Sequence, residues 1–154
     1  MAKFFGDLRR RLEKFRQLDA DRMAFDLAKT GNFQDLVVEL NTEDQLFNKG
    51  EDSTGTKLSD IGGDYSPITL KISEDEGRPK KSKSDINLHD TGAFYNSFIV
   101  RPFLGGFEIN ADLIKDGESL ADDWGENIIG LNEQNLDRIR DEHKEFFQKE
   151  IKKI

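Results

Sequence analysis

Apolar and charged residues alternate with a helical period over the first part of the chain. The apolar residues return every three or four positions, which places them on one face of an α-helix, and the pattern runs until Gly31. Since glycine commonly ends a helix, the sequence predicts one long amphipathic N-terminal helix with a bend near Asp19. The apolar positions are Phe4, Phe5, Leu8, Leu12, Phe15, Leu18, Met23, Phe25, Leu27 and Ala28.

A second helical stretch is predicted over residues 33–47, ending before Gly50. Residues 50–87 are polar and repeatedly interrupted by glycine and proline, so we expect a long irregular segment there. One short helix is predicted within it, because Ser66 is placed to cap a helix start and Pro67 suits the first turn. Irregular segments of this length tend to be functional or to become ordered on assembly.

Two apolar stretches that flank a pair of glycines predict a β-hairpin. Phe98-Ile99-Val100 forms the first stretch and the alternating residues 107–111 form the second, with Gly105-Gly106 between them. Apolar strands joined by a short glycine-containing turn are typical of a hairpin. A short helix is expected next, from Asp116 to Trp124.

A final amphipathic helix is predicted from Asn132 onward. Asn132 is a favourable N-cap, and Leu131 can pack on Leu136 across the helix start. Acidic residues lie early in this helix and lysines late, which suits the helix dipole. The apolar face consists of Leu136, Ile139, His143, Phe146, Phe147, Ile151 and Ile154.

The composition limits the size of the hydrophobic core. Of the 154 residues, 35% are hydrophobic and 35% are charged, so much of the surface must face water or a partner. We expect a single α+β domain over residues 1–154, with a long N-terminal helix, an irregular middle segment, a small antiparallel β-sheet with a hairpin, and a C-terminal amphipathic helix. Its parts are an N-terminal helical arm (1–49), a loop segment (50–87) and a core of hairpin and C-terminal helix (88–154).

The net charge of −8 argues against general nucleic-acid binding, because neutralising phosphates requires clustered Lys and Arg. Two local basic patches remain, and solvated surface charge explains them best. The absence of cysteine excludes disulfides and thiolate metal sites. The sequence predicts neither a signal peptide nor a membrane-spanning helix. The patches are Arg9, Arg10, Arg11, Lys14 and Arg16, and Lys80, Lys81 and Lys83.

The triplet Asp90-Thr91-Gly92 has two incompatible interpretations. In aspartic proteases such a turn presents a carboxylate that shares a proton with a second one. In the other interpretation, Asp90 or Thr91 caps a short helix. Two fragments favour the protease: the run Asp52-Ser53-Thr54-Gly55, and Ile128-Ile129-Gly130, which resembles the apolar-apolar-Gly element of retroviral-type aspartic proteases. Because the first run has no flanking strands, we favour the cap.

No other set of residues predicts catalysis, a cofactor or a metal site. His143 belongs to the apolar face of the last helix, where a packed ring is expected, and His89 is the only other histidine. Asp122, Asp123 and Glu126 offer carboxylates to a hard cation, but their spacing does not match a calcium loop. A solvated helix end is favoured instead. Phosphate-binding glycine loops and nucleophile elbows are absent.

Four short motifs follow one another along the chain. They are a Gly-containing loop that leads to an aromatic residue and a Ser-Pro-x-Thr helix start, a basic Gly-x-Pro loop, a Leu-x-x-Thr-Gly-x-x-x-x-Ser run, and a Gly-Leu start to the last helix. The residues are Asp52, Gly55 and Tyr65-Ser66-Pro67-Ile68-Thr69; Gly77-Arg78-Pro79; Leu88-His89-Asp90-Thr91-Gly92-Ala93-Phe94-Tyr95-Asn96-Ser97-Phe98; and Gly130-Leu131-Asn132-Glu133. This order resembles that of the tail-completion or neck proteins of tailed bacteriophages, the virion morphogenesis group.

The resemblance implies a structural protein that is not an enzyme and forms a ring of about six or twelve copies at the head-to-tail junction. It implies other neck, connector and tail proteins as partners, genomic DNA that passes through the lumen without sequence-specific binding, and no membrane. The expected location is the virion, in the neck or tail, and the host cytoplasm during assembly. The implied motif and assembly residues are Tyr65, Ser66, Pro67, Thr69, Asp90, Thr91, Gly92, Phe94, Tyr95, Ser97, Gly130 and Leu131.

A ring subunit needs one surface patch that meets a different patch on its neighbour. We expect residues 50–87 and the N-terminal helix to supply these patches, and the charge of −8 suits a conduit for DNA. Two alternatives stay open: a retroviral-type aspartic protease that uses Asp90 in a dimer, and a small nucleic-acid-binding regulator. The regulator would bind through Arg9, Arg10 and Arg11 and the loop at Lys80.

Overall fold

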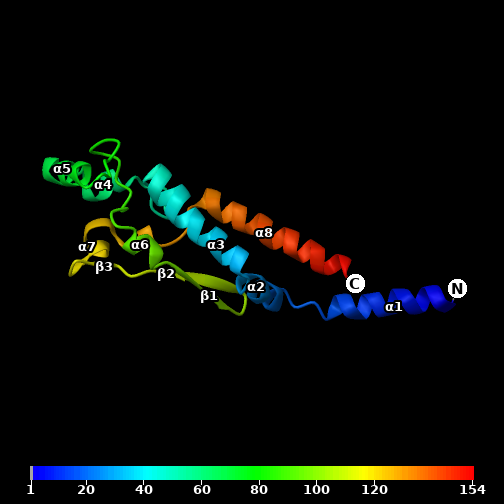
Figure 1. Cartoon of the computed structure of the whole chain (residues 1–154). Coiled ribbons are helices and arrows are strands. Elements are labelled where there is room, and N and C mark those ends of the chain that lie inside the picture. Colours follow the sequence, from blue (N-terminus) through cyan, green and yellow to red (C-terminus); the bar gives the residue numbers. More distant parts are fainter. Residues whose placement is uncertain (1) are drawn as a thin grey trace.

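A continuous helical rod runs through the middle of the molecule (Figure 1). In the computed structural model, which describes residues 2–154, α3 (Gly31–Glu39) continues directly into the π-helix η1 (Leu40–Lys49). Gly50 ends the rod with a φ of 61°, and a Cβ atom there would lie 2.8 Å from the carbonyl oxygen of Ile86. The predicted second helical stretch is confirmed, and its latter half takes the rare π form.

The N-terminal part of the chain forms two helices where the sequence predicts one. α1 (Ala2–Arg16) and α2 (Ala20–Ala28) are separate elements. The side chain of Asp19 accepts hydrogen bonds from the amides of Asp21 and Arg22, at 3.0 and 3.2 Å, and so begins a new helix. The predicted bend near Asp19 is therefore a break.

The predicted end of the N-terminal helical pattern before Gly31 is confirmed to within three residues. α2 ends before Lys29, and Gly31 is the first residue of α3. Thr30 turns the chain between the two helices with an extended backbone, φ −72° and ψ 138°. The turn lies between the first and second helical stretches that the sequence predicts.

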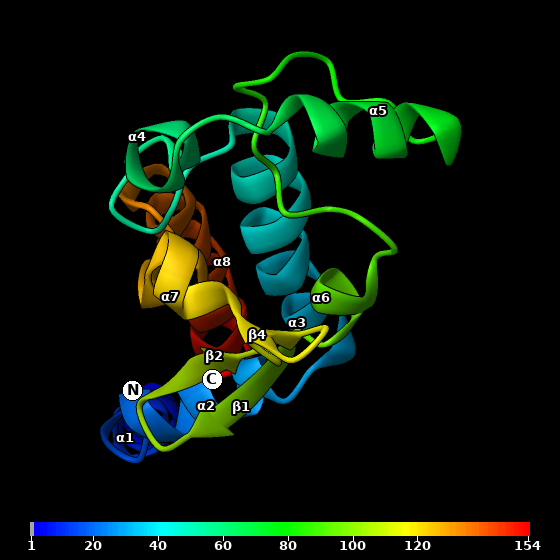
Figure 2. The same ribbon diagram turned by 90° about the vertical axis from the view of Figure 1, so that its left-hand side faces the viewer.

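The predicted β-hairpin is confirmed. β1 (Ile99–Phe103) and β2 (Gly106–Asn110) pair in antiparallel fashion, and Leu104 and Gly105 form the turn. Gly105 has a φ of 94°, and its amide donates to the carbonyl oxygen of Asp21 at 3.2 Å. This contact fixes the tip of the hairpin against α2 (Figure 2).

A second, smaller hairpin replaces part of a predicted helix. β3 (Ile114–Lys115) pairs with β4 (Glu118–Ser119) through a turn at Asp116 and Gly117, whose φ angles are 52° and 81°. The helix expected from Asp116 onward starts only at α7 (Leu120–Trp124). An Asp-Gly pair is a strong hairpin signal, and here it takes precedence over the helical pattern.

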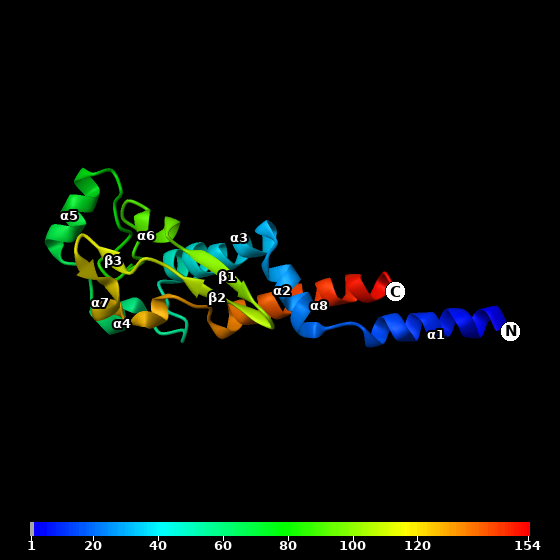
Figure 3. The same ribbon diagram turned by 90° about the horizontal axis from the view of Figure 1, so that it is seen from below.

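The middle segment contains the predicted short helix. α5 (Pro67–Asp75) begins with Pro67 in its first turn, and the Ser66 hydroxyl accepts the amide of Thr69 at 3.1 Å. The predicted cap at Ser66 is confirmed. Figures 1 and 3 place α5 at the end of the molecule opposite to α1.

The middle segment is more regular than predicted, because it also contains α4 (Leu58–Gly62). Leu58 is fully buried in the core. Gly62 lies so close to the indole of Trp124 that a Cβ atom would approach the ring to 2.5 Å. This long-range contact with α7 has no local sequence signal.

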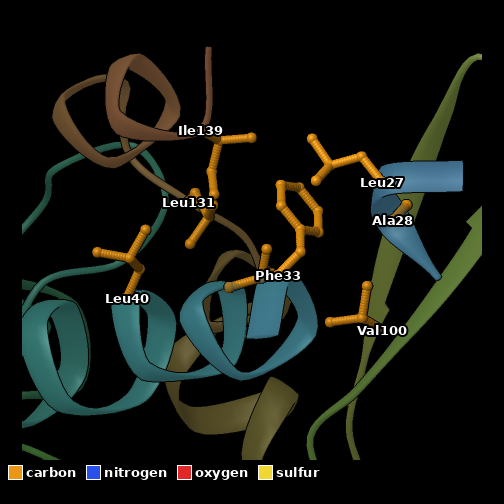
Figure 4. Packing of buried hydrophobic residues seen from close by; sticks show 8 residues of the cluster. Leu27, Ala28, Phe33, Leu40, Val100, Leu131 and Ile139 are labelled. Atoms are coloured by element: carbon orange, nitrogen blue, oxygen red, sulfur yellow. The ribbon is translucent and has the colours of Figure 1, made fainter. Parts of the chain in front are cut away.

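Two hydrophobic clusters form the core. Phe33 lies in the first cluster (Figure 4), and its ring stacks edge to face on Phe107 and on His143, each with 5.4 Å between centroids. The packed ring predicted for His143 is confirmed. The first cluster consists of Leu27, Ala28, Phe33, Val37, Leu40, Val100, Leu131 and Ile139. The second consists of Leu46, Leu58, Ile86, Phe94, Tyr95, Phe98 and Ile128.

Buried amide side chains join the rod to the C-terminal part of the chain. Asn41 donates to the carbonyl oxygen of Ile128 at 3.1 Å and accepts the amide of Gly130 at 2.7 Å. Gln45 donates to the carbonyl oxygen of Gly130 at 2.8 Å and accepts the amide of Asn132, also at 2.8 Å. This amide cluster consists of Asn41, Gln45, Asn132 and Asn135.

The start of α8 (Glu133–Lys152) belongs to the same cluster. The Asn132 side chain accepts the amide of Asn135 at 3.0 Å, so the predicted cap is confirmed. Asn135 in turn donates to the carbonyl oxygen of Leu40 at 3.2 Å and to Asp44 at 3.0 Å. The short η2 helix (Glu126–Ile128) leads into this region.

We predict that Asn41→Ala lowers the free energy of unfolding by about 3 kcal/mol, because it leaves two buried backbone groups without partners, each worth about 1–3 kcal/mol. Urea unfolding monitored by circular dichroism measures the change. The matched control is Asn48→Ala, an exposed asparagine in the same helix, with an expected change below about 0.5 kcal/mol. Equal changes in the two variants would show that the amide cluster contributes nothing specific.

Candidate functional site

A buried asparagine organises the region around the Leu-x-x-Thr-Gly-x-x-x-x-Ser run. The amide of Asn87 donates to the Tyr65 hydroxyl at 3.3 Å, and its carbonyl oxygen accepts the hydroxyl of Tyr95 at 2.5 Å. Its side-chain oxygen accepts the Lys80 ammonium at 3.1 Å and the His89 amide at 3.0 Å. The structure thus brings together two predicted motif residues, Tyr65 and Tyr95.

Sequence reasoning missed Asn87. Its only signal is a polar residue between the apolar Ile86 and Leu88, in a segment expected to be irregular. Leu88 has a φ of 58°, a conformation that costs a non-glycine residue about 1–2 kcal/mol. The hydrogen bonds on Asn87 hold this turn, and burial raises the pKa of both Tyr65 and Tyr95, so both hydroxyls keep their protons at neutral pH.

Asp90 is the centre of an ion-pair network. One of its carboxylate oxygens lies 2.9 Å from the Arg78 guanidinium and the other 2.9 Å from the Lys115 ammonium. The hydrogen bond from Lys115 lowers the pKa of the Asp90 carboxyl most, and the charge of Arg78 lowers it further against the opposing effect of burial. Arg78 also pairs with Glu76. Asp90 is therefore ionised at neutral pH.

Of the two residues predicted as alternative caps of a short helix, Asp90 bonds no helix amide within the described residues, and Thr91 makes the local hydrogen bond. α6 (Ala93–Asn96) starts after Gly92, whose φ is 88°. The Thr91 hydroxyl accepts the amide of Ala93 at 3.3 Å. Because Thr91 bonds this amide, the Asp90 carboxylate can point to the two cations.

The remaining residues of the run connect α6 to the first hairpin. The Ser97 hydroxyl donates to the carbonyl oxygen of Phe94 at 2.6 Å and accepts the amide of Asp112, which follows β2, at 2.9 Å. Phe94 and Tyr95 are buried in the second hydrophobic cluster. The motif therefore positions the start of β1 and the chain that follows β2.

Three predicted residues line a cavity of about 290 Å³ between α5 and α7: Tyr65, Thr69 and Asp90. Ile72 and Trp124 contribute apolar walls to this α5–α7 cavity. Ser66 and Pro67 start α5 and do not line it.

Lys80 also reaches the α5–α7 cavity. Its ammonium lies 5.2 Å from the centroid of the Tyr65 ring and bonds the carbonyl oxygen of His89 at 2.5 Å. Burial lowers the pKa of this lysine, and the charge of Asp90 partly opposes that effect.

Gly130 and Leu131 lie apart from this cavity. Gly130 has a φ of 127° and exchanges hydrogen bonds with the amide cluster, while a Cβ atom on it would lie 3.2 Å from Ser53. Leu131 is buried in the first hydrophobic cluster. Their contribution is to join the rod to α8.

The two fragments that favoured a protease have local partners. Asp52 accepts hydrogen bonds from the amide and hydroxyl of Thr54, at 2.8 and 2.6 Å, and from the amide of Thr56 at 3.1 Å. Ile128 is fully buried. Within residues 2–154 the charged groups that pair with the Asp90 carboxylate are cations, whereas a proton-sharing dyad needs a second carboxylate.

The other prominent feature is the uncovered helix α1. Every side chain from Phe4 to Gln17 is exposed, so this part of the chain makes little contact with the rest of the molecule (Figure 3). Phe4 is 68% exposed and Phe15 is 53% exposed. We call the apolar face of α1 the arm stripe, and it consists of Phe4, Phe5, Leu8, Leu12 and Phe15.

The described residues contain no grouping of three or more His, Asp and Glu side chains suited to a metal ion. None of the helices in residues 2–154 combines the length and apolarity needed to cross a membrane. Comparison with protein-family models, with curated proteins and with solved structures found no match to this chain.

We predict that Asp90→Asn lowers the free energy of unfolding at neutral pH by less than about 1 kcal/mol, because the ion pairs are partly exposed. The folded-state pKa of Asp90 lies below its ordinary value. The stabilisation is therefore present above about pH 3.9, the ordinary pKa of an aspartate, and is lost as the pH falls through the folded-state pKa.

Urea unfolding of both proteins between neutral pH and about pH 2 tests this linkage. The difference between wild type and Asp90→Asn should vanish at the acidic end. Asp60→Asn is the control, because Asp60 is exposed and makes no ion pair within the described residues. If the difference in the free energy of unfolding between wild type and Asp90→Asn grows on acidification, Asp90 is not stabilised in its ionised form by Arg78 and Lys115.

Proposed function

We propose that this chain is a structural assembly subunit, and that it forms a ring at the head-to-tail junction of a tailed bacteriophage, in the neck or tail. The uncovered arm stripe carries the proposal. An amphipathic helix is stable in water only when its apolar face is covered. A helix that the chain itself leaves uncovered supports a role in binding another molecule.

The positions of the motif residues support the same proposal. Tyr65, Tyr95 and Ser97 make hydrogen bonds that hold the fold, and Gly130 does so in the amide cluster. Motifs that serve the fold suit a structural protein of the resembled group, whose neighbours would be other neck, connector and tail proteins around the passing DNA.

The two rival functions receive less support. An aspartic protease needs a second carboxylate beside Asp90, and Asp90 faces cations instead. A nucleic-acid regulator needs a continuous basic surface. Figures 1 and 3 place α1 and the loop after α5 at opposite ends of the molecule, and Lys83 in that loop pairs with Asp64.

Light scattering of the purified chain, followed by negative-stain imaging, tests the proposed function. A closed ring of about six or twelve copies is the expected result. A strict dimer would favour the protease, and loss of peptide cleavage in Asp90→Ala would then establish it. DNA binding that weakens steeply with salt would favour the regulator.

We predict that deleting residues 2–17 abolishes the ring. At a concentration at which wild type is dissociated, the deletion changes the free energy of unfolding by less than about 0.5 kcal/mol, the effect typical of exposed positions. The reason is that the side chains from Phe4 to Gln17 are exposed in the single chain. Light scattering measures the first effect and urea unfolding the second. A truncated chain that still forms the ring would refute a role of α1 in assembly.

A further inference from the structure

The molecule has a second uncovered apolar surface at the end opposite to α1. On α5, Ile68 is 73% exposed and Ile72 is 51% exposed. They are four positions apart in one helix and therefore share a face. Ile72 also lines the α5–α7 cavity, together with Leu120 and Trp124. We call this surface, formed by Ile68, Ile72 and the mouth of the cavity, the acceptor face.

The arm stripe is bordered by positive charge. At about 100° per residue, Arg9 and Arg16 lie along one edge of the stripe and Arg11 along the other. α1 as a whole contains six Lys and Arg against two Asp and Glu. Within the described residues, Arg9, Arg11 and Arg16 make no ion pair.

The acceptor face is bordered by negative charge. Asp75 follows Ile68 and Ile72 on the same face of α5, with the exposed Lys71 beside it. On α7, the exposed Asp123 lies closer than Asp122 to the side of the helix that carries Leu120 and Trp124. In the described part of the chain these three carboxylates make no ion pair. In the neighbouring loop, Arg78 pairs with Asp90, Lys83 pairs with Asp64, and Lys80 bonds Asn87 and His89, while Lys81 is exposed.

The two surfaces lie too far apart to meet within one chain. Figures 1 and 3 show α1 beyond one end of the rod and α5 at the other end. Contact between unlike surfaces at opposite ends joins copies head to tail, and such contacts close into a ring when the rotation between neighbours is suitable.

The α5–α7 cavity offers a place for an aromatic anchor. Its volume is about 290 Å³, and its lining includes the apolar Leu88, Leu120 and Trp124. Aromatic side chains that enter such pockets commonly dominate binding energy at protein interfaces. The arm stripe supplies Phe4, Phe5 and Phe15 for this purpose.

We propose that α1 of one copy docks its arm stripe on the acceptor face of the next copy, with a phenylalanine at the α5–α7 cavity and the α1 arginines facing Asp75 and Asp123. This inference rests on the proposed function and identifies its interface. The occupant of the acceptor face is therefore a second copy of this chain.

Two full-length variants that are each defective on one side test the proposal. The arm variant is Leu8→Asp/Leu12→Asp, and the acceptor variant is Ile68→Asp/Ile72→Asp. All four positions are exposed, so both variants should keep the circular dichroism of wild type, and also its urea unfolding at a concentration at which wild type is dissociated. The expected result is that each variant alone is a monomer in light scattering.

Mixing the two variants should restore one contact only. The arm variant retains the acceptor face and the acceptor variant retains the arm, so we expect a complex of one copy of each and no larger species. Matched controls that change the charge equally are Arg10→Gln/Lys14→Gln, away from the arm stripe, and Lys144→Gln/Lys149→Gln, exposed on α8. Both controls should assemble like wild type.

Several outcomes would overturn the proposal, and they separate its failure from that of the ring. If the acceptor variant still assembles, α1 helices bind one another. The proposed interface would then be wrong, while the proposed ring would still stand. A mixture that stays monomeric would exclude the interface. A monomeric wild type that binds anionic phospholipid vesicles would refute both the interface and the ring, because α1 would then be a membrane-surface helix.

Discussion

The side chains of Asn41 and Gln45 fix the position of the C-terminal part of the chain relative to the central rod. The segment from Ile128 to Asn132 belongs to no sheet, yet its buried backbone groups need hydrogen-bond partners. Two amides spaced four residues apart on η1 supply them, each as donor and acceptor. This pairing directs Ile128 into one hydrophobic cluster and Leu131 into the other. It also sets where α8 begins, so both clusters depend on it.

Sequence periodicity predicted the elements whose signals are local. α8, α5 and the first hairpin each have a cap or turn residue at the boundary, such as Asn132, Ser66 or Gly105, and they form where expected. The elements that were missed have different causes. The second hairpin had a local signal in Asp116-Gly117 that competes with a helical pattern, whereas α4 depends on a distant contact. α4 is held by the approach of Gly62 to Trp124. The break at Asp19 was not predicted as a helix start, because the apolar positions continue at helical spacing on both sides of it.

The candidate site was predicted only in part for the same reason. Tyr65 and Tyr95 were identified by the motifs they belong to, but the residue that joins them, Asn87, has no motif. The role of Asp90 depends on Lys115, twenty-five positions later in the sequence, and on Arg78. No local pattern encodes such a pairing, so the sequence suggested a cap or a catalytic carboxylate where the molecule has an ion-pair network.

The connection between α1 and α2 is short, and it alone orients the helix that reaches outward. Only residues 17–19 separate the end of α1 from the start of α2, and Asp19 is committed to capping. A small change in the backbone torsions of Gln17 and Leu18 would swing the whole of α1 as a lever about 22 Å long. The curvature of an assembly built through α1 would then be set by this joint, which permits one rigid subunit to fit openings of different radius.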